Sequence, residues 1–164
     1  MSDAKRDAVD LGQTAGALMG HHVPHCGRLG MEVLHTAGTT ARVRLPWNPE
    51  LVGDPVRGVV FGGAITTLLD HASGIAVFLS LDEIVAVATL DLRIDYLRAA
   101  EPGFDLIGES TCYKRTANVA FVRATAWEHT PDDPFASCLA TFMLTAGPGD
   151  ANAIRAAVRG GSPA

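Results

Sequence analysis

Two adjacent glycines and one acid, all within a single apolar stretch, are the residues of this sequence best suited to chemistry. The glycines are Gly62 and Gly63, and the acid is Asp70. Apolar residues around them recur at three- and four-residue steps, which predicts a helix over residues 62–81. The first N–H groups of a helix have no acceptor within it, and the helix dipole favours negative charge there. Because glycine has no side chain, a carbonyl oxygen can approach the Gly62 N–H closely, as an oxyanion site requires.

Asp70 lies two turns into this helix, where nearly every neighbouring position is small or apolar. Burying a carboxylate without a partner is costly, so an acid at such a position indicates a functional role. That role is general base or nucleophile toward an acyl group. Two structural alternatives stay open: Asp70 forms a salt bridge, for example with Arg93, and the two glycines only allow the helix start to pack tightly.

The spacing between Gly62 and Asp70 predicts that one chain does not complete the site. The two residues are eight positions apart, which corresponds to roughly 12 Å along a helix axis. A carbonyl bound at Gly62 therefore cannot meet a water held by Asp70 of the same helix. We expect a dimer with two equivalent sites, each with Gly62 from one chain and Asp70 from the other.

The remaining elements must form a sheet that covers this helix. Alternation of apolar and polar residues predicts strands before and after it, and short turns between the later strands predict antiparallel pairing. One of these strands places Leu92 and Tyr96 on its apolar face and Thr89 on the less apolar face. The fold class is therefore α+β, an antiparallel sheet wrapped around one long central helix. The expected strands are residues 28–35, 39–45, 88–96, 104–113, 119–128 and 135–145, with a loop at 46–58.

Composition limits the class of protein. The chain has 164 residues with 48% hydrophobic residues and a net charge of -5. Such a chain folds as one domain and does not resemble a nucleic-acid binder, which needs a basic footprint. Three dispersed cysteines indicate neither a disulfide framework nor a metal site. Without a secretory signal or a membrane-spanning stretch, we expect a cytoplasmic protein with no membrane partner. The expected organisation is a helical lead-in at 1–24 that Pro24 closes, a domain at 25–146 and a loose tail at 147–164.

The order of elements and the motif from Val60 to Gly74 resemble the hotdog-fold thioesterases of the phenylacetate-degradation (PaaI-like) group. In that family the helix opens with His-Gly-Gly and a catalytic carboxylate follows nine residues after the His, which corresponds to Phe61 and Asp70 here. The block from Thr89 to Arg98 is similar to the family's third strand. The resemblance implies a hotdog fold and an acyl-CoA thioesterase that acts on an acyl or aryl-acyl coenzyme A. It implies no metal or other cofactor, and a homodimer that commonly pairs into a homotetramer.

The resemblance also implies roles for individual residues. Asp70, the Gly62 N–H and Thr89 would be catalytic, with Thr89 helping to place the water. Ser73 and Gly74, one turn beyond Asp70, either line the pocket or serve packing. Turn residues of relatives often meet the phosphates of coenzyme A, although turn cations are also commonly just solvated. The residues expected to contact substrate are Phe61, Gly63, Ser73, Gly74, Arg98, Lys114 and Arg115.

Two departures from the family pattern keep a second function open. Phe61 occupies the position of the family's His, and Pro55 occupies a loop position where relatives often have Asn. The alternative is a hotdog protein that binds acyl-CoA with weak or no turnover. A hotdog dehydratase is a weaker third reading, because that chemistry pairs the acid with a His that Phe61 replaces.

Overall fold

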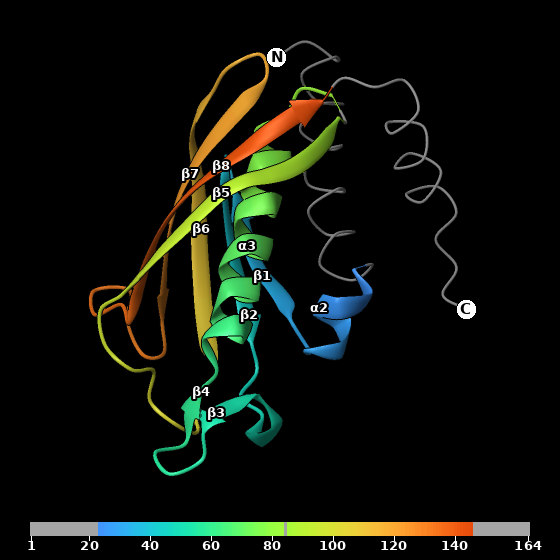
Figure 1. The fold of residues 1–164 in the computed structure, drawn as a ribbon. Helices are drawn as coiled ribbons and strands as arrows, with labels where there is room; N and C mark the ends of the chain where they lie inside the picture. The colour runs from blue at the N-terminus through green and yellow to red at the C-terminus, as the bar shows by residue number, and fades with distance from the viewer. Residues whose placement is uncertain (1–22, 84, 146–164) are drawn as a thin grey trace.

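A computed structural model describes residues 23–83 and 85–145. It contains one long helix, a six-stranded antiparallel sheet and a small two-stranded hairpin (Figure 1). The α+β architecture expected from the sequence is confirmed. The helices are α2 (Pro24–Arg28), the 3-10 turn η1 (Pro49–Leu51) and α3 (Gly62–Leu79), and the strands are β1 (Glu32–Ala37), β2 (Thr40–Leu45), β3 (Val52–Asp54), β4 (Val59–Val60), β5 (Ala86–Tyr96), β6 (Leu106–Arg115), β7 (Val119–Trp127) and β8 (Ala136–Thr145).

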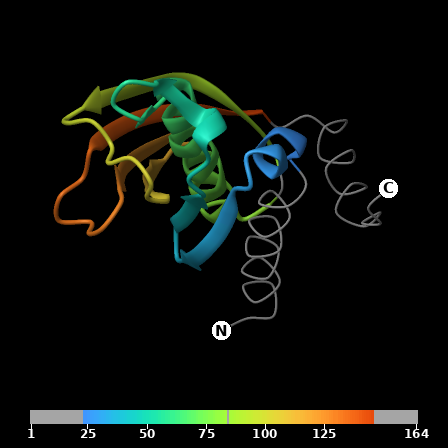
Figure 2. The same ribbon diagram turned by 90° about the horizontal axis from the view of Figure 1, so that it is seen from below.

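The large sheet has the strand order β1-β2-β6-β7-β8-β5, and every neighbouring pair is antiparallel. Seen from below, the sheet curves around α3, which lies on its inner face (Figure 2). β5 forms one edge of this sheet, so one row of its backbone groups has no partner strand among residues 23–83 and 85–145. This edge lies beside the half of α3 that carries Gly62 and Asp70.

α3 is buried because the sheet packs closely against it. Leu68, Leu69, Ala72 and Ile75 are fully buried, and the Leu68 side chain lies so close to Gly108 of β6 that no larger residue fits there without a shift. The helix is long and apolar enough, with a mean hydropathy of 1.3, to pass a simple test for a membrane span. In this fold those apolar residues instead form the centre of the core.

Strand β2 shows the expected alternation. Ala41, Val43 and Leu45 are buried against the helix, while Arg42 and Arg44 lie on the opposite face. Both arginines form ion pairs there, Arg42 with Glu109 and Arg44 with Glu32 and Asp105. The period of two in the sequence therefore identified the core face of this strand correctly.

Two local expectations were wrong, and a third lies partly outside the described residues. Pro24 begins α2, where its fixed φ and missing N–H suit the first helical turn, and the helix expected before it falls in residues 1–22, which the structure does not describe. The first strand starts at Glu32, later than expected, because α2 and the turn after it occupy residues 24–30. The stretch 46–58 is not only a loop: it contains η1 and β3, and β3 pairs with β4. The lead-in up to residue 22 and the tail from residue 147 lie outside the described residues.

Candidate active site

An irregularity in β5 brings Thr89 to the helix. The pairing with β8 shifts between Thr89 and Asp91, so Leu90 is an extra residue and its side chain is 55% exposed. Before this bulge the odd-numbered residues face α3, and after it the even-numbered residues do, because one inserted residue reverses the alternation. The expectation that Thr89 and Tyr96 lie on opposite faces of the strand was therefore wrong, since both reach the helix.

Asp70 and Thr89 are in direct contact. The Thr89 hydroxyl donates a hydrogen bond of 2.8 Å to Asp70 Oδ1. Asp70 is half-buried and Thr89 is exposed, so the pair lies at the open edge of the molecule. The possible salt bridge between Asp70 and Arg93 does not form, because Arg93 pairs with Asp95 instead. Among the described residues, no hydrogen bond or ion pair reaches the second carboxylate oxygen of Asp70, so this oxygen can accept a proton or hold a water.

Gly62 and Gly63 form the first turn of α3. Phe61 is the N-cap residue and provides no side-chain hydrogen bond, although its carbonyl accepts one from the Ala64 N–H. Within residues 23–83 and 85–145, neither the Gly62 N–H nor the Gly63 N–H donates a hydrogen bond. Two donors therefore lie together at the positive end of an 18-residue helix. That arrangement suits a developing oxyanion.

Phe61 is fixed between two glycines. A Cβ atom on Gly63 would lie 2.4 Å from Phe61 Cε1, and a Cβ on Gly53 of β3 would lie 2.9 Å from Phe61 Cα. The ring nonetheless remains 63% exposed. The structure therefore places an apolar side chain beside the first turn of the helix, at the position where the family carries a His. The glycines pack tightly and their N–H groups are also accessible. A packing role for Gly62 and Gly63 and a role in binding an oxyanion therefore do not exclude each other.

Gly62 and Asp70 do not meet within one protomer. They lie on the same straight helix, and each contacts a different part of β5: the Gly62 carbonyl accepts a hydrogen bond from Tyr96, and Asp70 accepts one from Thr89. The structure thus contains both halves of the expected site but separates them, as the spacing in the sequence predicts.

Ser73 and Gly74 lie beyond Asp70 and differ in their surroundings. Ser73 is fully buried, and its hydroxyl lies 3.2 Å from that of Ser110 of β6, between helix and sheet. Gly74 is half-buried, and an added Cβ would meet no atom within 4 Å. The structure therefore gives Ser73 a packing role and leaves space beside Gly74.

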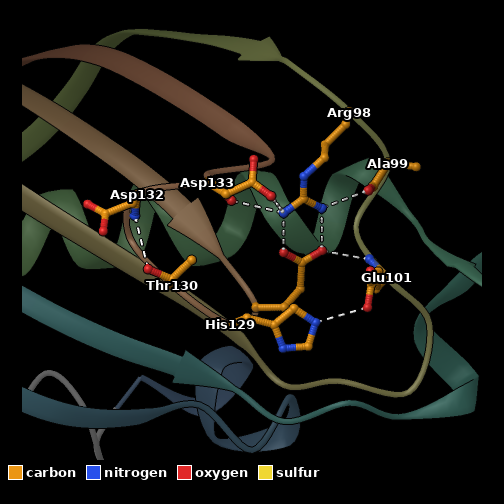
Figure 3. A network of polar contacts seen from close by, with 8 residues as sticks. Arg98, Ala99, Glu101, His129, Thr130, Asp132 and Asp133 are labelled. Atoms are coloured by element: carbon orange, nitrogen blue, oxygen red, sulfur yellow. Dashed lines mark hydrogen bonds and ion pairs between the residues drawn. The ribbon is translucent and has the colours of Figure 1, made fainter.

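Arg98 belongs to a polar network that joins two loops (Figure 3). Its guanidinium forms two hydrogen bonds of 2.7 Å with Glu128, whose side chain is 0% exposed, and it also contacts Asp133. Burial raises the pKa of Glu128, but the hydrogen bonds from Arg98 and the Glu101 N–H outweigh it and leave the pKa below its ordinary value. A phosphate would have to compete with these partners for Arg98. We therefore leave Arg98 out of the proposed substrate contacts.

Lys114 and Arg115 lie at the end of β6, far along the chain from the helix start. Both are exposed. Arg115 forms an ion pair with Asp82, next to a small cavity of about 150 Å³ that also borders Leu144. No ion pair to Lys114 occurs in the part of the chain that the structure describes. Contact of these cations with coenzyme A remains a prediction.

The thiols and His71 near Asp70 are poor candidates for chemistry. Burial raises the pKa of Cys138 to about 11 and also raises that of Cys26, and the charge of Asp70 adds to both effects. Burial lowers the pKa of His71, against the opposing effect of Asp70. His71 is buried among the core residues of the helix. No group of three His, Cys, Asp or Glu side chains that could hold a metal occurs among the described residues.

Tyr96 is the residue of this region that the sequence analysis overlooked. It was assigned only to the apolar face of its strand, yet its side chain is 51% exposed and its hydroxyl donates to the Gly62 carbonyl at 3.1 Å. A tyrosine at the end of a strand, in place of an aliphatic residue, was the available signal.

Comparisons with known proteins identify relatives of this chain. The family model described as the thioesterase superfamily matches residues 57–134. A Halobacterium salinarum protein named "putative esterase" is 35% identical over 126 residues, which cover 72% of this chain and 82% of that protein. The medium/long-chain acyl-CoA thioesterase YigI of Escherichia coli is 28% identical over 143 residues, which cover 79% of this chain and 90% of YigI.

Solved structures show the same fold. A crystal structure of a protein from Pseudomonas aeruginosa has a TM-score of 0.72 and 39% sequence identity, and the match covers 81% of this chain and 98% of that one. The Escherichia coli PaaI protein of the phenylacetic acid degradation operon has a TM-score of 0.73 at 16% identity, over 84% and 97% of the two chains. The chain has a central helix wrapped by an antiparallel sheet, a family match that includes Gly62 and Asp70, and the Halobacterium salinarum relative above 30% identity. It therefore belongs to the thioesterase superfamily and is a thioester hydrolase with the hotdog fold.

Proposed function

We propose that this protein hydrolyses an acyl or aryl-acyl coenzyme A thioester to the free acid and coenzyme A. The observation that carries the proposal is the contact between Asp70 and Thr89 on a helix whose first two N–H groups have no partner among the described residues. YigI, a relative named as a medium/long-chain acyl-CoA thioesterase, supports coenzyme A thioesters as the substrate class.

The reaction needs a nucleophile, a place for negative charge and a leaving thiolate. Either a water deprotonated by Asp70 or the Asp70 carboxylate itself attacks the thioester carbon. The carbonyl π electrons move to oxygen, and the Gly62 N–H stabilises that oxyanion. Collapse of the tetrahedral species breaks the C–S bond and releases the thiolate. On the nucleophilic route, water then cleaves the acyl–Asp70 anhydride. Thr89 orients Asp70 through its hydrogen bond.

The site is completed by a second copy of the chain. β5 has 11 residues and forms an edge of the sheet that no other strand of the described residues covers. Pairing it with β5 of a partner across a two-fold axis would cover that edge. Both Thr89 and Tyr96 face the helices, so an antiparallel pairing can place Thr89 of one chain opposite Tyr96 of the other. Gly62, which bonds Tyr96, then approaches the Asp70 that bonds Thr89 in the partner. Exposed Tyr113, Leu139 and Met143 on the outer face of the sheet support further pairing of such dimers into tetramers.

Mixing two inactive variants tests the shared site. Asp70→Asn removes the acid, and Gly62→Pro removes one N–H while its fixed φ suits the first position of a helix. Each variant alone should release little thiol from acyl-CoA. A dimer with one chain of each kind has one intact site, so random mixing should restore about a quarter of wild-type turnover. If unfolding and refolding the two together restores none, although each refolds, the site lies within one chain and the proposal is wrong.

The alternative function is acyl-CoA binding without turnover. Phe61, which is fixed in place of the family's His, is the observation that keeps it open. A thiol-release assay over aromatic, short, medium and long acyl-CoA substrates, together with calorimetric binding of the same compounds, separates the two. Binding without thiol release across the whole panel would favour the binder.

A further inference from the structure

The carbonyl of Gly62 accepts more hydrogen bonds than a helix requires. Thr66 Oγ1 donates to it at 3.0 Å and Tyr96 Oη donates at 3.1 Å. The Thr66 contact is a common one within helices, since a threonine hydroxyl often bonds the carbonyl four residues earlier. The Tyr96 contact is not local, because it joins residues 34 positions apart, from β5 to the helix.

This carbonyl belongs to the same peptide group as the Gly63 N–H. Hydrogen bonds in a chain polarise one another, so donors on the oxygen of an amide make its N–H a stronger donor. The peptide between Gly62 and Gly63 thus receives two hydroxyl groups on its oxygen, while its N–H has no acceptor within the described residues. The two hydroxyl groups therefore polarise the Gly62–Gly63 peptide and make its N–H, which faces the proposed acyl group, a stronger donor.

We propose that Tyr96 is a positioning residue for thioester hydrolysis. Its hydroxyl, together with that of Thr66, orients and polarises the Gly62–Gly63 peptide so that the Gly63 N–H acts as a second oxyanion donor beside the Gly62 N–H. The inference rests on the proposed function, because it requires an acyl oxygen at the start of α3.

The surroundings of Tyr96 support this role over simple core packing. Half of its side chain is exposed, so the ring contributes less to the core than a buried aromatic residue does. The bulge at Leu90 turns Tyr96 toward the helix. Gly62 also leaves the space for its hydroxyl, because a Cβ at that position would lie 3.1 Å from Tyr96 Oη.

The neighbouring peptide provides a matched control. Thr67 Oγ1 donates to the Gly63 carbonyl at 3.0 Å, so it repeats the Thr66 contact one residue later. The N–H of that peptide belongs to Ala64 and is already bonded to the Phe61 carbonyl. Polarising the Gly63–Ala64 peptide therefore cannot strengthen a donor to substrate, which separates the proposed effect from a general effect on helix stability.

The experiment compares four conservative variants of the full chain: Tyr96→Phe, Thr66→Val, Thr67→Val and Tyr113→Phe. Tyr113 is the only other tyrosine and is similarly exposed, on the outer face of the sheet. Because Tyr96 and Thr66 tune a donor without removing it, each of their variants should lower kcat about three- to tenfold with KM unchanged. Thr67→Val and Tyr113→Phe should stay within about twofold of wild type.

A spectroscopic readout separates polarisation from tethering. In an Asp70→Asn background, the thioester carbonyl stretch of bound acyl-CoA is measured by isotope-edited infrared spectroscopy. Adding Tyr96→Phe should raise its frequency, because a weaker donor polarises the carbonyl less. Adding Thr67→Val should leave it unchanged.

The possible failures are distinguishable. An active wild type with unchanged kcat and carbonyl frequency in Tyr96→Phe would overturn the inference, even if that variant melts at a lower temperature, because Tyr96 would then only tether β5. A wild type without turnover on any acyl-CoA would refute the proposed hydrolysis itself.

Discussion

Asp70 differs from the other carboxylates near the edge of the sheet in what it contacts. Asp91 is exposed on β5, and Asp95 is exposed and paired with Arg93. Asp70 comes from the helix and is held by a neutral hydroxyl, that of Thr89. A carboxylate that is oriented by a hydroxyl and pairs with no cation among the described residues can act as a base or nucleophile. At the scale of residues, this contact is what sets Asp70 apart from Asp95 and supports its proposed role in catalysis.

Asp70→Asn should reduce kcat by roughly 10²- to 10⁴-fold, because it removes the base or nucleophile while keeping the side-chain shape. Thermal unfolding should change little, since Asn can still accept the Thr89 hydrogen bond. Asp91→Asn, on the same edge but without contact to the helix, is the control and should retain wild-type kcat. Retention of full turnover by Asp70→Asn would remove Asp70 from the mechanism.

Gly63→Ala should disturb Phe61, because the new Cβ would lie 2.4 Å from the ring. We expect a loss of about 1–3 kcal/mol in the free energy of unfolding, typical of overpacking. In a Phe61→Ala background, adding Gly63→Ala should lower the free energy of unfolding by less than it does in the wild type, since the clash is gone. Gly74→Ala is the matched control: it has open space and should stabilise the helix by about 0.5–1 kcal/mol in urea unfolding. Equal losses for both alanine variants would contradict the packing of Phe61.

At the scale of elements, hydrophobic periodicity predicted the central helix and the buried face of a strand, but it missed the β-bulge made by one inserted residue. The 3.6-residue period located α3, and the period of two located the buried face of β2 through Ala41 and Val43. The bulge at Leu90 left no signal, because a bulge is set by pairing with β8 and not by the strand's own residues. The expectation that Thr89 belongs to the same site as Asp70 therefore came from the family resemblance and not from alternation, and their direct contact was not predicted.

The network around Glu128 should contribute to stability and not to substrate binding. Arg98→Met leaves a fully buried carboxylate with one fewer partner, so we expect a loss of up to roughly 3–5 kcal/mol in urea unfolding at neutral pH. Arg93→Met removes an exposed pair and should cost less than about 1 kcal/mol. A raised KM for acyl-CoA with unchanged stability in Arg98→Met would instead indicate a phosphate contact.

The same network predicts a dependence on pH. The folded pKa of Glu128 is below its ordinary value, so its contribution to stability is present above that ordinary value and is lost as pH falls through the folded pKa. In Arg98→Met the hydrogen bonds from Arg98 that lower the pKa of Glu128 are gone, so burial should raise the pKa of Glu128. The difference in unfolding free energy between wild type and Arg98→Met should therefore be largest at neutral pH and shrink in acid. A constant difference would exclude Glu128 as its cause.

For the whole molecule, the bulge also determines how two copies can pair. If Thr89 of one β5 lies opposite Tyr96 of the other and Leu90 is skipped in both, Leu92 lies opposite Ile94 and Arg93 lies opposite its own symmetry mate. Residues that face each other then point to the same side of the joined sheet, as antiparallel pairing requires. The proposed two-fold axis therefore passes beside Arg93.

Arg93→Cys should form a disulfide between two chains under mild oxidation, seen as a dimer on non-reducing gels. Asp95→Cys should not, because its expected neighbour is Asp91 of the partner chain. The native cysteines Cys26, Cys112 and Cys138 are buried and free, so they interfere little. Efficient cross-linking through Asp95→Cys with none through Arg93→Cys would exclude this register.

The position of α3 in the chain has a consequence for synthesis on the ribosome. The helix ends at Leu79, and only β1 and β2 of the large sheet precede it. Ser110, the partner of Ser73 in β6, is translated 37 residues later. This apolar helix thus leaves the ribosome before the strands that cover most of it. A nascent chain that has completed α3 but not yet β6 exposes an apolar helix, and we expect chaperones that bind apolar segments to contact the chain at this stage.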